Sequence, residues 1–148
     1  MMSVYSEELL EMDISGFIIP SERVAHVQGG NNLEHALLVL TKTGYTAIPV
    51  LDPQYKLQGL LATPAILDSI LGLQRIEFEQ LEQKRVAEVM SCDIPRLKIT
   101  DKIKKGLALL IDHPFVCVEN EEGYFEGILT RRALLKKLNQ DLHTKRSV

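Results

Sequence analysis

The sequence predicts an α+β fold made of two tandem β-α-β-β-α repeats that pack sheet against sheet with pseudo-two-fold symmetry. Three observations predict it: an apolar helical pattern that occurs twice, a pair of strand-like runs after each copy, and a second helical pattern after each pair. Neither repeat could bury its sheet alone, so the two are expected to form one body. The expected segments are residues 14–72 for the first repeat, 73–85 for a connector, 86–142 for the second repeat and 143–148 for a flexible tail.

Each repeat begins with a short strand-like segment and a helix. Apolar positions in residues 33–40 have the i, i+3, i+4, i+7 spacing of one buried helical face, and residues 103–110 repeat it. The shift between the two copies is 70 residues (103 − 33). Asn31 and Asp101 stand two residues before these patterns, where a short polar side chain predicts a helix N-cap.

A β-hairpin is expected after each of these helices. In both copies two apolar runs flank a turn that is rich in Pro, Gly, Asp or Glu, as in a hairpin of buried strands. The step from Val50 to Gly59 equals the step from Val118 to Gly127, nine residues each. The strands are expected at residues 48–52, 57–61, 116–120 and 125–129.

Each hairpin runs into a second helix. Pro64 suits the first turn of such a helix, and Gly72 is expected to end it. The connector should be partly helical and should lead into a short helix at residues 86–90. The apolar residues expected to face the core are Ile66, Leu67, Ile70 and Leu71 in the first copy and Leu134, Leu135, Leu138 and Leu142 in the second.

Composition excludes several classes of function. A net charge of −3 argues against a nucleic-acid-binding surface, and no apolar run approaches the ~20 residues of a membrane span. The N-terminal residues 1–8 lack the basic and apolar regions of a signal peptide, so a cytoplasmic protein is expected. The four His and two Cys residues do not have metal-ligand spacing, and no catalytic motif is present. The sequence therefore predicts a protein that is not an enzyme and holds no metal, and it predicts residues 119–122 to be a solvated acidic surface.

One basic motif, Thr130-Arg131-Arg132, lies where the last strand enters the last helix. Free backbone amides and the helix dipole favour anions there, so the motif predicts a phosphate site in which each charge-assisted hydrogen bond contributes ~1.5–3 kcal/mol. The alternative is that two exposed arginines simply begin a surface helix. The corresponding residues 62–65 carry no cation, which predicts one working site instead of two.

The repeat order, residues 48–52 and residues 127–132 together resemble the CBS domain pair, also called the Bateman module. This resemblance implies a disc-shaped homodimer with one ligand per chain, held between the start of one repeat and the end of the other. It implies that the backbone of Ala25 and Ala47 lines an adenine edge, that Tyr45 packs near the base and that Arg23 adds a third cation. The ligand-binding residues that it implies are Arg23, Val24, Ala25, Tyr45, Thr46, Ala47, Ile128, Thr130, Arg131 and Arg132.

The identity of the ligand depends on Ala133. CBS nucleotide sites usually have an Asp for the ribose at this place, so the alanine disfavours AMP, ADP or ATP. Residues 24–27, 31–49 and 115–120 are similar to small stand-alone CBS proteins, which implies cyclic di-AMP as ligand. The same resemblance implies a non-catalytic signalling protein whose partners are the (p)ppGpp synthetase/hydrolase Rel and pyruvate carboxylase. An AMP, ADP or ATP sensor is the alternative, and a structural dimer with a vestigial cleft is a further one.

Overall fold

The computed structural model describes the backbone of residues 4–146 and the side chains of residues 7–141. The chain forms two compact units. The central unit is Ala25–Ile94, and the terminal unit joins the N-terminal segment up to Val24 to the segment from Pro95 onward. Among the described residues, no helix combines the length and apolar character needed to cross a bilayer.

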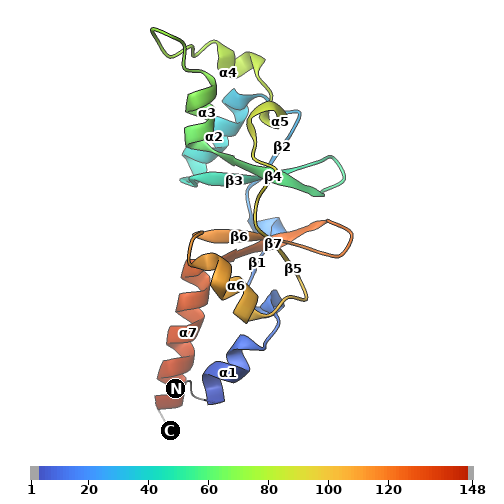
Figure 1. Ribbon diagram of the computed structural model, residues 1–148, viewed down its shortest axis with the longest axis vertical. Helices are drawn as coiled ribbons and strands as arrows, with labels where there is room; N and C mark the ends of the chain where they lie inside the picture. The colour runs from blue at the N-terminus through green and yellow to red at the C-terminus, as the bar shows by residue number, and fades with distance from the viewer. Residues whose placement is uncertain (1–3, 147–148) are drawn as a thin grey trace. The chain divides into compact units, whose positions relative to one another are not determined.

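The central unit contains one complete β-α-β-β-α repeat around a three-stranded mixed sheet of order β2-β3-β4 (Figure 1). Strand β2 is parallel to β3, and β3 is antiparallel to β4. The predicted order of elements is confirmed, and two short connector helices follow it. The elements are β2 (Val27–Gln28), α2 (Leu33–Thr43), β3 (Ala47–Leu51), β4 (Leu57–Ala62), α3 (Thr63–Ser69), α4 (Gln80–Gln83) and α5 (Val86–Val89).

The terminal unit contains the second repeat and a four-stranded sheet of order β1-β7-β6-β5. Its β-α-β-β-α order is also confirmed. The repeat elements are β5 (Arg96–Lys98), α6 (Ile103–Leu110), β6 (Phe115–Glu119), β7 (Phe125–Thr130) and α7 (Arg131–Arg146). The N-terminal segment adds α1 (Val4–Leu10), the 3-10 turns η1 (Ile14–Gly16) and η2 (Ser21–Arg23), and β1 (Ile19–Pro20).

The compact units divide the chain at other points than the predicted repeats. Residues 14–24, expected in the first repeat, pack with the second one. Ile14 is fully buried in the terminal core, and its amide donates to the Asp101 carbonyl at 2.9 Å. Strand β1 pairs antiparallel with β7 through Ile19 and Ile128. An edge strand with unpaired amides and carbonyls is stabilised by such a partner, and the repeat pattern alone carries no sign of it.

The two predicted N-caps are wrong by one residue. Asn32 is the N-cap of α2, and its Oδ1 accepts a hydrogen bond from the His35 amide at 2.9 Å. Asn31 instead accepts from the Gln28 amide at 2.8 Å, and so closes the turn before the helix. In the second repeat Asp101 accepts from the Lys98 amide at 2.7 Å in the same way, while Lys102 is the cap position. Both polar side chains therefore stabilise the strand-to-helix turn.

The last helix of each repeat buries a narrower face than the sequence suggested. Helix α3 ends at Ser69, before Gly72. Of the four apolar residues expected to face the core, Ile66 and Ile70 are buried but Leu67 and Leu71 are exposed. In α7, Leu134 is buried and Leu138 packs against the terminal core, but Leu135 is exposed. The side chain of Leu142 lies outside the described residues.

Helix α7 also continues through Arg146, so the part of the expected tail up to that residue is helical in the structure. Residues 147–148, the remainder of that tail, lie outside the described residues, as do residues 1–3 at the N-terminus.

The two hairpins use the same turn chemistry. Asp52 Oδ1 accepts from the amides of Gln54 and Lys56, both at 2.9 Å. Asn120 Oδ1 accepts from the amides of Glu122 and Tyr124, both at 3.0 Å. An Asx side chain that mimics a backbone turn explains why both hairpins form at the predicted places.

Candidate functional site

The predicted phosphate motif lies at the junction of β7 and α7. Thr130 is the last residue of β7, and its Oγ1 accepts a hydrogen bond from the Ala133 amide at 2.9 Å. This is N-cap geometry, in which a hydroxyl satisfies one of the free amides of the first helical turn. The hydroxyl proton remains able to donate, for example to a phosphate oxygen.

Arg131 has a structural role in addition to its predicted one. Its Nε donates to the Leu110 carbonyl at 2.9 Å, and its Nη2 donates to the Ile111 carbonyl at 3.3 Å. These carbonyls lie at the C-terminus of α6, where a cation is favoured by the helix dipole. The guanidinium has five N–H donors, so these two bonds leave donors for a ligand.

A surface groove of about 710 Å³ opens at this junction, entirely within the terminal unit. Thr130, Arg131 and Arg132 all line it, and that the groove binds a phosphate stays a prediction. Lys136 and Asn139, which were not among the residues predicted from the sequence, also line it. They follow Arg132 at four and seven residues along α7, the spacing of one helical face, which is the signal that could have found them. The lining residues are Pro114, Thr130, Arg131, Arg132, Leu135, Lys136 and Asn139.

Three further predicted site residues belong to the same unit. Arg23 ends η2 and is exposed, whereas Val24 and Ile128 are buried. The turn η2 packs against β7, since β1 directly before it pairs with that strand. The structure therefore brings the segment that carries Arg23 to the strand that ends in Thr130.

The other four predicted residues lie in the central unit. Tyr45 and Thr46 are exposed just before β3, and Ala47 begins that strand opposite Ala62. Ala25 packs against the central core. The Thr46 carbonyl accepts from the Thr63 amide at 3.2 Å, which ties this segment to the start of α3. That these four face the α7 groove across a shared ligand stays a prediction.

The first repeat lacks the features of the α7 groove. Ala62, the counterpart of Thr130, is the N-cap of α3 and provides no side-chain hydrogen bond. Thr63, Pro64 and Ala65 follow where the second repeat has two arginines and Ala133. The asymmetry that the sequence predicts between the two helix starts is thus also an asymmetry of capping.

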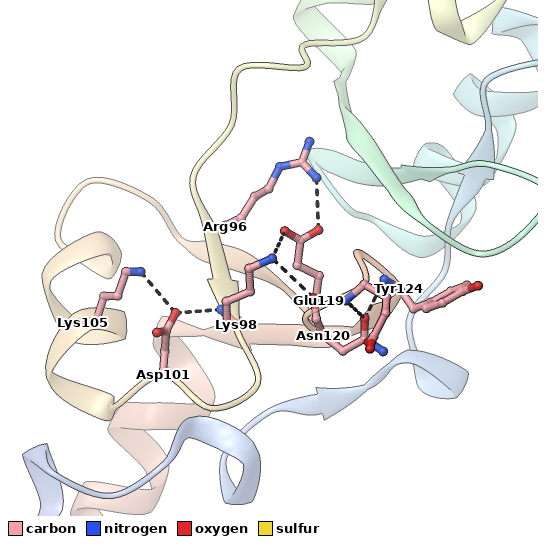
Figure 2. A network of polar contacts seen from close by, with 8 residues as sticks. Arg96, Lys98, Asp101, Lys105, Glu119, Asn120 and Tyr124 are labelled. Atoms are coloured by element: carbon pink, nitrogen blue, oxygen red, sulfur yellow. Dashed lines mark hydrogen bonds and ion pairs between the residues drawn. The ribbon is translucent and has the colours of Figure 1, made fainter.

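A second polar cluster, around Glu119, shows that one prediction from the sequence is wrong. Glu119 was expected on a solvated acidic surface, but only 7% of it is exposed. Its carboxylate lies 3.3 Å from Arg96 Nη1 and 3.0 Å from Lys98 Nζ (Figure 2). Strand β5 is parallel to β6 and places Lys98 opposite Glu119. Arg96 and Lys98 are two residues apart on one strand, so their side chains lie on the same face of the sheet. This two-residue spacing of the cations is the sequence pattern that could have predicted the cluster.

The described residues hold no group of three or more His, Cys, Asp or Glu side chains that could bind a metal ion.

Comparison with known proteins identifies the family. A family model for the CBS domain matches residues 86–140. Cyclic di-AMP receptor B of Bacillus subtilis (strain 168) is 60% identical over 144 residues, which are 97% of this chain and 98% of the relative. That relative bears the name of a receptor, in agreement with the prediction of a non-catalytic protein.

Solved structures agree with this assignment. A conserved hypothetical protein from Geobacillus kaustophilus has a TM-score of 0.85 and 59% identity, and the match covers 88% of this chain and 98% of that one. The CbpB protein of Listeria monocytogenes, solved in complex with cyclic di-AMP, has a TM-score of 0.81 and 53% identity, and the match covers 88% and 98%. With its two β-α-β-β-α units and these near-full-length relatives, the chain belongs to the CBS domain family.

Proposed function

We propose that this chain is a receptor for cyclic di-AMP that acts on partner proteins according to its ligand occupancy and has no catalytic step of its own. The observation that carries the proposal is the cationic groove at the start of α7, found in a chain that is 60% identical to cyclic di-AMP receptor B. The CbpB structure that contains cyclic di-AMP supports the same ligand.

The chemistry of the groove suits a ligand with two phosphates. Arg132 and Lys136 provide cations on one face of α7, Thr130 provides a hydroxyl, and Arg131 keeps free N–H donors. Each charge-assisted hydrogen bond to a phosphate oxygen contributes about 1.5–3 kcal/mol. Ala133 offers no carboxylate for ribose hydroxyls, so recognition would rest on phosphates and on the adenine contacts expected from Ala25, Tyr45 and Ala47.

The proposal includes a homodimer. An apolar groove of about 230 Å³ lies between α6 and α7, and Leu107, Ile111 and Leu135 on its walls are exposed. Exposed apolar side chains grouped on two adjacent helices are typical of a surface that another subunit covers. Arg131 lines both this groove and the cationic groove, so ligand occupancy could be transmitted to the α6–α7 face by a shift in population between two arrangements.

Titration calorimetry with cyclic di-AMP tests the ligand. We expect one ligand per chain and an affinity that falls about tenfold or more in Arg132→Ala, as loss of one charge-assisted contact predicts. Lys137→Ala is the matched control, since Lys137 is an exposed cation on α7 that does not line the groove. An Arg132→Ala variant that binds as tightly as the wild type would refute the site.

Competition with AMP, ADP and ATP separates the two nucleotide classes. With all ligands at one common concentration, we expect cyclic di-AMP to displace each of them and to raise the free energy of unfolding the most. The gain is about 2.7 kcal/mol when that concentration is a hundredfold above the Kd of cyclic di-AMP. Tighter binding of ATP or AMP would support the energy-sensor alternative, and no stabilisation by any of them would support a vestigial cleft.

The partner proteins form the last part of the proposal. We infer from the resemblance that the ligand-free protein binds Rel and that pyruvate carboxylase is a second partner. Co-purification of each partner with and without cyclic di-AMP tests this: complex formation with Rel should be lost when the ligand is added. A complex that is equally stable in both states would contradict regulation by occupancy.

A further inference from the structure

The connector between α3 and α4 in the central unit is a tightly hydrogen-bonded hairpin. Leu71 and Ile76 pair as an antiparallel bridge. Inside this pair, the Gly72 amide donates to the Arg75 carbonyl at 2.8 Å, and just outside it the Glu77 amide donates to the Ile70 carbonyl at 2.7 Å. These bonds define one conformation for the loop.

Gly72 allows this turn to close. A Cβ at Gly72 would lie 3.0 Å from the Arg75 carbonyl oxygen and 3.0 Å from the Glu77 carboxylate, so a larger residue would push the two arms of the hairpin apart. The ends of the connector are anchored as well, because Ile70 and Leu81 are buried in the central core.

Four large apolar side chains protrude from this ordered hairpin. Leu73 is fully exposed, Phe78 is 61% exposed, and Leu71 and Ile76 are 57% and 39% exposed. Single exposed apolar residues are common, but four within eight residues of a pinned loop form a patch of the kind that marks protein interaction sites. A groove of about 610 Å³ runs along the hairpin and gives such a partner a place to insert a side chain. Its lining residues are Leu71, Gly72, Leu73, Gln74, Arg75 and Glu77.

The charges around the patch select the chemistry of the partner. Glu77, Glu79 and Glu82 lie on or directly after the hairpin. The nearby cations are Arg75 and Lys84, whose Nζ donates to the Ser69 carbonyl at the end of α3. Arg75 is already bonded to Glu79, with Nη1 at 3.1 Å from Oε2. The surface around the apolar patch therefore carries excess negative charge, which repels nucleic acids and anionic membranes and attracts Lys and Arg side chains.

We propose that the connector hairpin, residues 71–78 with Glu82, is a docking site for a protein segment that combines Leu or aromatic anchors with Lys or Arg residues. None of the ten predicted ligand-binding residues lies in it. It therefore gives the receptor a second recognition surface, in the central unit, and it stands independently of whether the chain binds cyclic di-AMP.

Selection of a displayed library of short random peptides on the full-length protein tests this site. The library is first depleted on the Leu73→Ser/Phe78→Ser double variant, so that peptides bound elsewhere are removed. We expect the surviving peptides to be enriched in Leu or aromatic residues together with Lys or Arg. Synthetic copies should bind the double variant about tenfold more weakly or worse, as loss of two anchor side chains predicts. Enrichment of acidic peptides, or binding that the double variant leaves unchanged, would overturn the proposal.

Two controls distinguish the site from general stickiness and from misfolding. Leu38→Ser replaces an exposed leucine on α2 of the same unit and should leave peptide binding unchanged. Glu77→Gln/Glu82→Gln keeps the apolar patch and should weaken binding severalfold, with a smaller effect at high salt. Analytical ultracentrifugation tests the alternative that a second copy of this chain covers the patch. If Leu73→Ser/Phe78→Ser changes the oligomeric state, the occupant is a second copy and the proposal is wrong.

Discussion

At the residue scale, Thr130, Arg131 and Arg132 have different surroundings although they are consecutive. The hydroxyl oxygen of Thr130 caps α7, and the guanidinium of Arg131 binds carbonyls at the end of α6. Arg132 is exposed and lines the groove, and it takes part in neither of these two contacts. We therefore expect Arg132 to be the residue of this motif whose removal affects a bound phosphate most and the fold least.

Glu119 gives the first stability prediction. Glu119→Gln removes a buried charge and leaves Arg96 and Lys98 facing each other, so we expect the free energy of unfolding in urea to fall by about 1–2 kcal/mol. Both cations are partly exposed, which keeps the loss below that of a fully buried pair. Lys105→Gln is the control: it removes an exposed pair with Asp101 at 3.3 Å and should cost less than about 0.5 kcal/mol. Equal effects of the two variants would contradict the role given to Glu119.

The two cysteines should differ in reactivity. Burial raises the pKa of the Cys117 thiol to about 12, whereas Cys92 is exposed. The thiolate is the nucleophile, so at about pH 8 iodoacetamide should modify Cys92 and spare Cys117 in the folded protein. In denaturant both should react, and mass spectrometry of each peptide measures the extent. Modification of Cys117 at the rate of Cys92 before unfolding would show that its strand opens readily.

At the scale of elements, the two hairpins could be predicted from the sequence, but the strand that pairs with β7 could not. The hairpins follow from local signals, because apolar runs and Asx turns lie within a few residues of each other. The partner of β7 does not, since β1 is more than a hundred residues away in sequence. Gly127 marks the contact: its φ is +149°, and a Cβ there would lie 2.1 Å from the Ile19 carbonyl oxygen.

Gly127→Ala should therefore separate β1 from β7. We expect a loss of roughly 3 kcal/mol or more in the free energy of unfolding, from backbone strain together with the clash at Ile19. Gly123→Ala is the matched control, because Gly123 also has a positive φ (+90°) but has no atom within 4 Å of the added Cβ. It should cost about 1 kcal/mol. Similar losses in both variants would mean that conformation alone, and not the β1 contact, demands glycine at 127.

At the scale of the whole molecule, the described buried residues form one hydrophobic core in each unit. The central unit is continuous in sequence, but the terminal unit is closed only when the N-terminal segment returns to residues 95–146. Ile14 of that segment is fully buried, and it packs in the same core as Leu97 and Leu129. The integrity of the groove on α7 thus depends on residues at the other end of the chain.

Ile14→Ala tests this dependence. We expect a loss of about 2–5 kcal/mol, as for other buried large-to-small changes, with amide hydrogen exchange rising first and most in β5, α6 and β7. Met12→Ala, an exposed neighbour in the same segment, should have little effect. Exchange that rises equally in the central unit would contradict the division into two cores.

The sequence alone determined the order of elements in both repeats, the family and the motif that lines the α7 groove. These depend on local signals: the helical spacing of residues 33–40 and 103–110, the nine-residue step in each hairpin, and two arginines at a helix start. Tertiary structure decided which units the N-terminal segment and β1 join, that Arg131 also caps α6, and that Glu119 is buried between two cations. Each of these outcomes depends on a contact between residues far apart in sequence, and their burial and pairing are fixed only when the chain has folded.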